Sequence, residues 1–269
     1  MIKFIEMISC KFSDKIITVT EGCKQLLIKR NVPAEKISLI LNAPDQKIFK
    51  FDSTRGFQVI TKNAVLLYHG TVAERFGLHD AIDAMVFINK AIPGSIFRIF
   101  GKYDEKYRKI LEKKIVTLEL TGIVILDEER TLEEISEFIR ESDIGIVPYI
   151  NNTYMNLALS TKTFEYAASG LPIVATKLRT LSTIFDNNSI SYTSSGNPED
   201  LAEKVINLCM GPELRRKQAV NANNSMNEIS DNIMAARYMN LVNTVISRNK
   251  LIISEQLAKR RMKYYKKVL

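Results

Sequence analysis

Two short segments of the sequence carry residues whose types and spacing could bind hydroxyl and phosphate groups. The first reads STKTFEYAASGLPIVA and begins at Ser160. Ser160 or Thr161 can cap a helix and Gly170 can end it, so this helix places Lys162 and Glu165 one turn apart on the same face. A carboxylate near a helix N-terminus, at the carboxyl edge of a parallel sheet, can accept hydrogen bonds from sugar hydroxyls. The alternative left open by the spacing is a solvated Lys–Glu pair, which contributes only about 0.3 kcal/mol.

The second segment, YHGTVAERFGL, follows an apolar run and opens a helical pattern. Gly70 at this turn lets a backbone approach a phosphate, and the helix N-terminus after it offers free N–H groups and a positive dipole end. Arg75 could add two parallel hydrogen bonds to a diphosphate. An ordinary strand–helix turn with a solvated arginine is the alternative, since one glycine turn is a weak signal.

Metal and thiol chemistry is not indicated by the sequence. The cysteines, Cys10, Cys23 and Cys209, form no Cys-x-x-Cys pair and have no histidine nearby in the sequence. The only histidines are His69 and His79. We therefore expect free thiols in a reducing compartment and no metal site.

The net charge of +8 is concentrated at one end of the chain. Residues 248–269 contain eight basic residues and one acid, a charge of +7, so the other 247 residues sum to +1. The body is therefore not a basic surface for nucleic acid. The basic segment has two interpretations: a helix on an anionic membrane, where each basic charge contributes about 1 kcal/mol, or a solvated helix.

The elements that must position the two segments form an alternating pattern. Short apolar runs, typical of strands buried on both faces, alternate with charged helical patterns, which predicts a doubly wound α/β sheet. Thr131 with Glu134, and Asn197 before Pro198, are helix-start signals. The predicted strands are 15–19, 36–41, 64–68, 96–100, 122–126, 143–147, 171–175 and 189–192, and the predicted helices are 78–91, 103–117, 131–141, 161–169 and 198–210.

Three further features concern organisation. No apolar run reaches the roughly 18 residues of a membrane-spanning helix. Residues 42–63 contain turn chemistry and lack a clear period, which predicts a linker. Residues 1–41 then hold one strand–helix–strand unit, too little to bury a core of its own, so we interpret them as the end of another domain.

Six segments, in order along residues 12 to about 246, resemble retaining glycosyltransferases of family 4. STKTFEYAASGLPIVAT is similar to the motif of one subgroup, roughly S-x-x-K-x-F-E-Y-x-x-x-G-x-P-V, and YHGTVAERFGL is similar to the glycine loop that opens the donor domain. The other four similar segments are SDKIITVTEGCKQLLIKRNVPAEKISLILNAPDQKIF, FRIFGKYDE, ILDEERTLEEISEFIRESDIGIVPY and MAARYMNLVNTVI.

The resemblance implies a GT-B architecture, in which the C-terminal of two Rossmann-like domains holds most of a nucleotide sugar. We therefore expect the Rossmann-like sheet of that domain, a remnant of the N-terminal domain and a basic C-terminal helix. The implied activity is hexosyltransferase-like: a sugar passes from a UDP- or GDP-sugar to an acceptor hydroxyl with retention, in polysaccharide or glycolipid synthesis. The resemblance implies no cofactor and no essential metal, because basic side chains and a helix N-terminus stabilise the leaving diphosphate.

Carried over position by position, the resemblance assigns site residues. Arg75 and Lys162 are the cations that stabilise the diphosphate, and Glu165 binds the ribose hydroxyls. The segment 124–127 lies near the base. The donor-binding positions implied besides Glu165 are Gly70, Thr71, Gly101, Val124, Leu126, Asp127 and Thr161.

Three positions depart from the family pattern. A glutamate that many members carry eight residues before the position of Glu165 is Leu157 here. The usual Arg after the loop glycine is Thr71, and the usual Lys before the second glycine is Phe76. Arg75 lies next to that lysine position and is a candidate to replace it.

The resemblance also implies that most of the acceptor domain is missing. We expect residues 1–50 to be its remnant with the interdomain link, 51–227 the nucleotide-sugar-binding domain, and 228–269 a crossing helix with the basic tail. A second chain would then supply the acceptor domain. We expect a cytoplasmic location, with membrane contact at the inner face through 248–269, and no nucleic-acid partner.

Three alternatives remain open at this point. One is a non-catalytic nucleotide-sugar-binding subunit, or a fragment that needs a partner. Another is a nucleotide-sugar epimerase of the same fold. The last is an α/β scaffold without a ligand, for which Glu165→Ala would change little beyond a slight loss of stability.

Overall fold

The structure, a computed structural model, describes residues 2–268, and of residues 252, 253 and 258–268 it describes the backbone only. The chain divides into two compact units. Residues 42–230 form the larger, which we call the sheet unit. Residues 1–41 and 231–269 form the smaller, which we call the end unit.

The sheet unit is built on six parallel strands in the order β5-β4-β3-β6-β7-β8. Each predicted strand overlaps an observed one, because runs of Ile and Val with buried neighbours on both sides favour this structure. The fold class is confirmed. The bounds are β3 Val65–His69, β4 Ile96–Phe100, β5 Val124–Asp127, β6 Ile144–Val147, β7 Ile173–Thr176 and β8 Ser191–Thr193.

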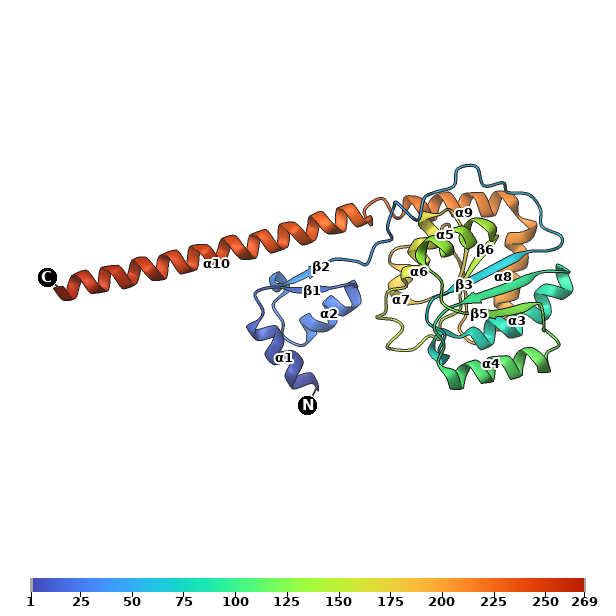
Figure 1. The fold of residues 1–269 in the computed structure, drawn as a ribbon, viewed down its shortest axis with the longest axis horizontal. Helices are drawn as coiled ribbons and strands as arrows, with labels where there is room; N and C mark the ends of the chain where they lie inside the picture. The colour runs from blue at the N-terminus through green and yellow to red at the C-terminus, as the bar shows by residue number, and fades with distance from the viewer. Residues whose placement is uncertain (1, 269) are drawn as a thin grey trace. The chain divides into compact units, whose positions relative to one another are not determined.

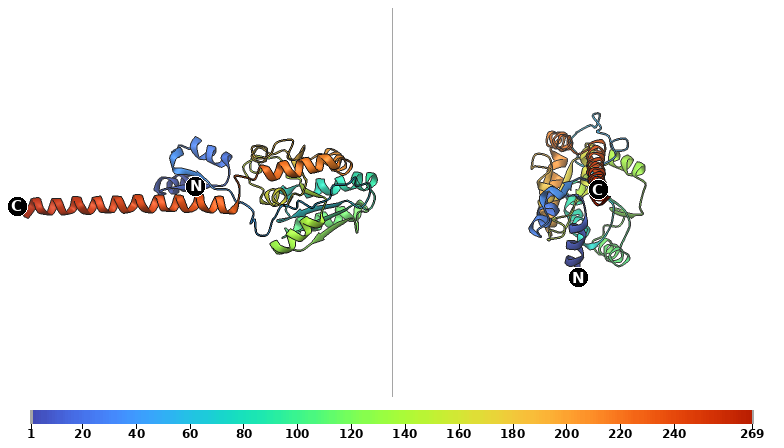
Figure 2. Two further views of the ribbon diagram at one scale, coloured as in Figure 1. Left: turned by 90° about the horizontal axis from the view of Figure 1, so that it is seen from above. Right: turned by 90° about the vertical axis from the view of Figure 1, so that its left-hand side faces the viewer.

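Helices cover both faces of this sheet (Figures 1 and 2). One group packs together as α3, α4 and α8, and α6 packs with α9. The helix bounds are α3 Leu78–Ala91, α4 Glu105–Thr117, α5 Leu132–Glu141, α6 Thr161–Ala168, α7 Arg179–Ser182, α8 Pro198–Met210 and α9 Pro212–Asn224, with a 3-10 turn, η2, at Glu74–Phe76.

Two predicted helix starts are confirmed. The Thr131 hydroxyl accepts from the Glu134 N–H at 3.3 Å, while the Glu134 carboxylate accepts from the Thr131 N–H at 2.9 Å. At α8, the Asn197 side chain accepts from the Asp200 N–H at 2.9 Å, and Pro198 occupies the first turn. Both caps satisfy N–H groups that have no partner inside the helix.

The core lies on both faces of β3 and its neighbours. Large side chains that are almost completely buried include Leu66, Leu67, Tyr68, Phe97, Phe164 and Tyr166. They come from β3, β4 and α6, so the core surrounds the strand that carries the predicted glycine loop. This packing fixes the carboxyl end of β3, where that loop begins.

The end unit contains a parallel pair of strands and four helical segments. Its bounds are α1 Ile2–Phe12, β1 Ile16–Thr18, α2 Glu21–Lys29, η1 Ala34–Lys36, β2 Ile37–Leu39 and α10 Asp231–Val268. The helix α10 is continuous (Figure 1), as expected for the C-terminal helix. The basic side chains predicted to meet a membrane lie mostly beyond residue 257, outside the described side chains. The interpretation of residues 1–50 as the end of an acceptor domain stays a prediction.

In the part of the chain that the structure describes, no helix is both long enough and apolar enough to cross a membrane. The sequence patterns predicted neither α1, α7 nor α9. In α9 the residues PELRRKQAVNANN are mostly polar, so no apolar stripe marks the helix.

Candidate functional site

The strand order reverses between β3 and β6. From β3 the chain winds outward through β4 to β5, and from β6 it winds the other way to β8. The loops that leave these two neighbouring strands therefore diverge, which leaves a crevice at their carboxyl ends. Both predicted segments lie there, since one follows β3 and the other leads from β6 into α6.

The glycine loop after β3 is held by close backbone contacts. A Cβ atom on Gly101, which follows β4, would lie 1.8 Å from the Gly70 carbonyl oxygen, so only glycine fits there. Gly70 itself has φ +105° and donates its N–H to the Phe100 carbonyl at 2.9 Å. A Cβ on Gly77, which has φ +62°, would lie 1.9 Å from the Pro148 carbonyl oxygen. These contacts hold the loop against the neighbouring strand ends.

Lys162 is buried at this point, with 7% of the residue exposed. Its Nζ donates to the Tyr149 hydroxyl at 2.6 Å and lies 4.6 Å from the ring centroid of Tyr68. The rings of Tyr149 and Phe76 are 4.9 Å and 5.3 Å away. None of the ion pairs among the described residues includes Lys162. A cation held by aromatic rings without a carboxylate has charge left to bind an anion.

The N-terminus of α6 adds to this positive field. Ser160 occupies the capping position, but its side chain does not bond a helix N–H. Its hydroxyl instead accepts from Thr163 Oγ1 at 2.7 Å and lies 3.2 Å from the Tyr149 hydroxyl. The first N–H groups of α6 are therefore left without a side-chain cap, as at helix termini that bind phosphate.

Glu165 lies one turn further along α6, against His69 at the end of β3. The His69 Nε2 and Glu165 Oε2 atoms are 3.1 Å apart. His69 is buried and 12% of the Glu165 side chain is exposed. Burial lowers the pKa of His69 below its ordinary value, against the opposing effect of Glu165, so the imidazole is neutral near pH 7. We call Tyr68, His69, Gly70, Phe76, Tyr149, Lys162 and Glu165 the switch-point cluster.

Arg75 remains exposed in the turn η2. Its guanidinium carbon lies 4.7 Å from the centroid of the Phe76 ring. Lys162 Nζ lies 5.3 Å from the same centroid. The Arg75 carbonyl accepts from the Ile150 N–H at 3.2 Å, which ties the loop after β3 to the segment after β6. The residue at the family's lysine position, Phe76, is thus part of the aromatic wall around Lys162.

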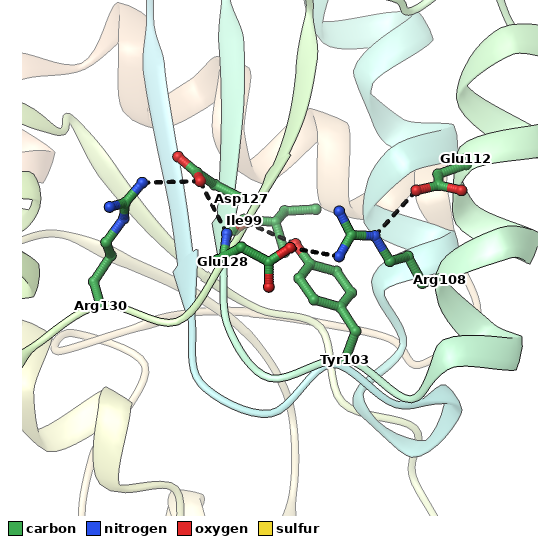
Figure 3. A network of polar contacts seen from close by, with 7 residues as sticks. All are labelled: Ile99, Tyr103, Arg108, Glu112, Asp127, Glu128 and Arg130. Carbon is green, nitrogen blue, oxygen red and sulfur yellow. Dashed lines mark hydrogen bonds and ion pairs between the residues drawn. The ribbon is translucent and has the colours of Figure 1, made fainter.

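The carboxyl end of β5 carries a second charged group, which we call the rim network (Figure 3). Asp127 accepts from Arg130 at 2.9 Å and from the Glu128 N–H at 2.9 Å. Arg108 bonds both Glu128, at 2.6 Å, and Glu112, at 3.0 Å, above the ring of Tyr103. The arginines here are paired with carboxylates near solvent, unlike Lys162. The rim network comprises Tyr103, Arg108, Glu112, Asp127, Glu128 and Arg130.

The structure brings most predicted site residues to one edge of the sheet. Gly70, Gly101, Lys162 and Glu165 lie around the carboxyl end of β3. Thr71 follows in the loop, where its carbonyl accepts from the Tyr68 hydroxyl at 2.6 Å, and Thr161 is the first residue of α6.

The predicted base-binding positions lie on the outermost strand of the sheet unit. Leu126 and Asp127 pair with Ile99 and Phe100, near the carboxyl edge. Val124 is buried at the amino end of β5 and is set apart from the others. Leu157 lies in the loop between β6 and α6.

The side chains that contact Lys162 and Glu165 were not predicted from the sequence. Tyr68 and Tyr149 are aromatic residues at or just after strand carboxyl ends, a signal that was available. His69 was assigned no role in the site from the sequence. In the described residues, no group of three or more His, Cys, Asp or Glu side chains is arranged to hold a metal ion.

Comparison with known proteins places this geometry in context. The sequence profile of the family described as Glycosyl transferases group 1 matches residues 63–210. An uncharacterized glycosyltransferase of Methanocaldococcus jannaschii is 27% identical over 205 residues, which are 76% of this chain and 52% of that protein. The chain thus spans about half the length of this curated relative.

The solved structures that share the fold include the following two. HepE of Anabaena, in complex with UDP and glucose, superposes with a TM-score of 0.74 at 17% identity, over 89% of this chain and 65% of HepE. The C-terminal domain of LpcC, a glycosyl transferase group 1 family protein of Francisella tularensis, gives 0.55 at 20% identity, over 68% of this chain and 96% of that domain. The sheet unit therefore has the fold of a GT-B C-terminal domain.

Proposed function

Since the chain belongs to the glycosyl transferases group 1 family, we propose that its sheet unit binds a nucleoside diphosphate sugar and takes part in transferring the sugar, with retention, to an acceptor hydroxyl. The observation that carries the proposal is Lys162, a buried cation without a carboxylate partner among the described residues, at the strand-order reversal. A diphosphate would supply the missing negative charge. UDP is the first nucleotide to test, because the HepE structures contain UDP and UDP-glucose.

The chemistry assigned to the cluster is stabilisation of the leaving diphosphate. As the bond between the anomeric carbon and the diphosphate oxygen breaks, negative charge grows on that oxygen. Lys162 and the uncapped N–H groups of α6 would face that charge, and Arg75 is the exposed cation that can join them. Preorganised donors of this kind contribute about 10²–10³-fold to the rate each.

Glu165 would accept hydrogen bonds from the ribose hydroxyls. It lies one turn from Lys162 on α6, so one helix would present both the carboxylate for the ribose and the cation for the diphosphate. Asp127 already accepts from Arg130 and Glu128, so contacts to the base would fall to the backbone near Leu126 and Asp127.

A thermal-shift and calorimetry panel tests the proposal. The ligands are UDP, GDP, ADP, dTDP and CMP, with an external dye because the chain has no Trp. One of the diphosphates at about 100 times its Kd should stabilise the wild type by about 2.7 kcal/mol. Lys162→Met should lose the effect, and the matched control Lys109→Met, on the exposed side of α4, should keep it. Stabilisation that survives Lys162→Met equally well would refute the assignment.

The end unit supports a further part of the proposal, that a β/α acceptor half outside these 269 residues packs on it. In α1, Glu6 contacts its own unit through an ion pair with Arg30. The apolar side of α1 is exposed, with Phe12 at 82% and Phe4 at 61%. The strands β1 and β2 pair only with each other among the described residues, and a two-stranded parallel pair is normally part of a larger covered sheet.

Co-expression with a candidate β/α domain and size-exclusion chromatography tests this part. The double variant Phe4→Ser with Phe12→Ser should break a complex that the control Val116→Ser, at an exposed position of α4, leaves intact. A complex that tolerates both apolar substitutions would contradict the assigned surface. Contact of residues 248–269 with anionic membranes belongs to the same proposal, and vesicle flotation with and without phosphatidylserine tests it.

A further inference from the structure

His69 and Glu165 form a buried pair that the transfer chemistry above does not explain. His69 is the last residue of β3, is 7% exposed, and precedes the glycine of the loop. Its Nε2 lies 3.1 Å from Glu165 Oε2, within hydrogen-bonding distance, and both atoms are buried without a hydrogen-bond partner at a suitable angle among the described residues. Oε2 is fully buried, so the exposed part of the Glu165 side chain lies on its other atoms.

The ring of His69 is fixed by its own packing. It meets the Tyr166 ring edge-on, with centroids 5.2 Å apart and an interplanar angle of 82°. The Tyr166 hydroxyl donates to the Leu67 carbonyl at 3.2 Å. A Cβ on Gly145 would lie 2.5 Å from the Tyr166 ring, so the small residue in β6 lets that ring approach the sheet. The imidazole therefore has a defined orientation.

We propose that His69 is a positioning residue for the donor site, which donates its Nε2–H to Glu165 and directs the second carboxylate oxygen at the ribose. This inference rests on the proposed function of Glu165. A neutral imidazole donates one hydrogen bond and leaves the full negative charge on the carboxylate. An arginine or lysine in the same place would compete with the ribose for that charge.

Positioning of the carboxylate favours ligand binding because a glutamate side chain has several rotatable bonds, whose freedom is lost when the ligand binds. Holding one oxygen before the ligand arrives removes part of the ordering cost of binding. The same strand end presents Gly70 next to Lys162, where a Cβ on Gly70 would lie 3.5 Å from Nζ. The carboxyl end of β3 thus serves the ribose through His69 and the diphosphate through Gly70.

The test compares UDP with 2′-deoxy-UDP by calorimetry, since only UDP carries the 2′-hydroxyl. The wild type should prefer UDP about tenfold, the scale of one hydrogen bond to a charged group. His69→Leu, which fills the space without an N–H, should reduce the preference to about twofold while the Kd for 2′-deoxy-UDP stays within about twofold. His69→Gln, which keeps a donor near the position of Nε2, should restore most of it.

Glu165→Ala separates failure of this inference from failure of the proposed function. If Glu165→Ala loses the preference and His69→Leu keeps it, Glu165 binds ribose without help and the inference is overturned. If Glu165→Ala keeps the preference, or the wild type has none, the ribose contact fails and the inference falls with it.

A second measurement needs no variant of His69. Nitrogen NMR of the wild type should show the imidazole neutral at pH 7 with its proton on Nε2. A proton on Nδ1 alone would overturn the inference, since Nε2 could then donate nothing to Glu165.

Discussion

The switch-point cluster and the rim network lie at the same edge of one sheet, yet they hold their charges in opposite ways. Lys162 is buried among aromatic rings and is paired with no carboxylate of the described residues, whereas Arg108 and Arg130 are paired with carboxylates near solvent. Surface ion pairs contribute about 0–1 kcal/mol each to stability, and no bound ligand is needed to account for them. An uncompensated buried cation is costly, so its presence points to a ligand that supplies the opposite charge.

The largest expected difference between the two regions is in nucleotide affinity. Lys162→Met should weaken binding of UDP about 100-fold, because a buried charge-assisted contact to the diphosphate is lost. Arg108→Met in the rim network should change the Kd by less than about twofold. Calorimetry measures the Kd for UDP of both variants. An equal loss of affinity in the two variants would contradict the difference between the switch-point cluster and the rim network.

Gly101→Ala should cost about 2–3 kcal/mol of stability, because its Cβ would meet the Gly70 carbonyl and displace the glycine loop. Gly56→Ala is the matched control, since nothing lies within 4 Å of the added atom. It should stay within about 0.5 kcal/mol of the wild type. Urea unfolding of both variants gives the two values, and a tolerated Gly101→Ala would show that the loop is not tightly held.

A smaller effect concerns the stability of the protein without ligand. Lys162→Met should raise the free energy of unfolding by about 1 kcal/mol, because an apolar side chain of similar length replaces a buried charge. A protein that gains stability and loses UDP binding would show that the charge is kept for function. Loss of more than about 1 kcal/mol would instead indicate that the aromatic rings hold Lys162 as a structural element.

The smallest effect belongs to the rim network. Arg108→Met should lower the free energy of unfolding by less than about 0.5 kcal/mol at physiological salt, although the residue forms two ion pairs. High salt should remove most of the difference, since exposed pairs are screened. Urea unfolding at 0.05 M and 1 M salt measures it. If high salt leaves the loss of stability unchanged, the ion pairs of the rim network behave as buried, energetically coupled pairs, which contradicts this prediction.

Local signals in the sequence located the elements well. The Thr131 capping box, the Asn197-Pro198 start and the Gly170 stop act within a few residues, so they can be read from neighbours alone. The helix α1 was missed because its apolar side faces away from its own unit, and no buried contact favours the pattern.

The site was predicted less completely for a different physical reason. Lys162 and Glu165 share one helix turn, and their spacing is visible in the sequence. Their partners Tyr68, His69 and Tyr149 come from other strands and meet them only through the strand order. The burial of Lys162 and the pairing of His69 with Glu165 are therefore tertiary properties that no local pattern encodes.

The central claim, that Lys162 is reserved for a diphosphate, is tested most directly by a cycle of two proteins and two ligands. Wild type and Lys162→Met are each titrated with UDP and with uridine, which lacks the phosphates. We expect the substitution to weaken UDP binding about 100-fold and uridine binding less than about threefold. An equal loss for both ligands would mean that Lys162 supports the shape of the site and does not bind the diphosphate.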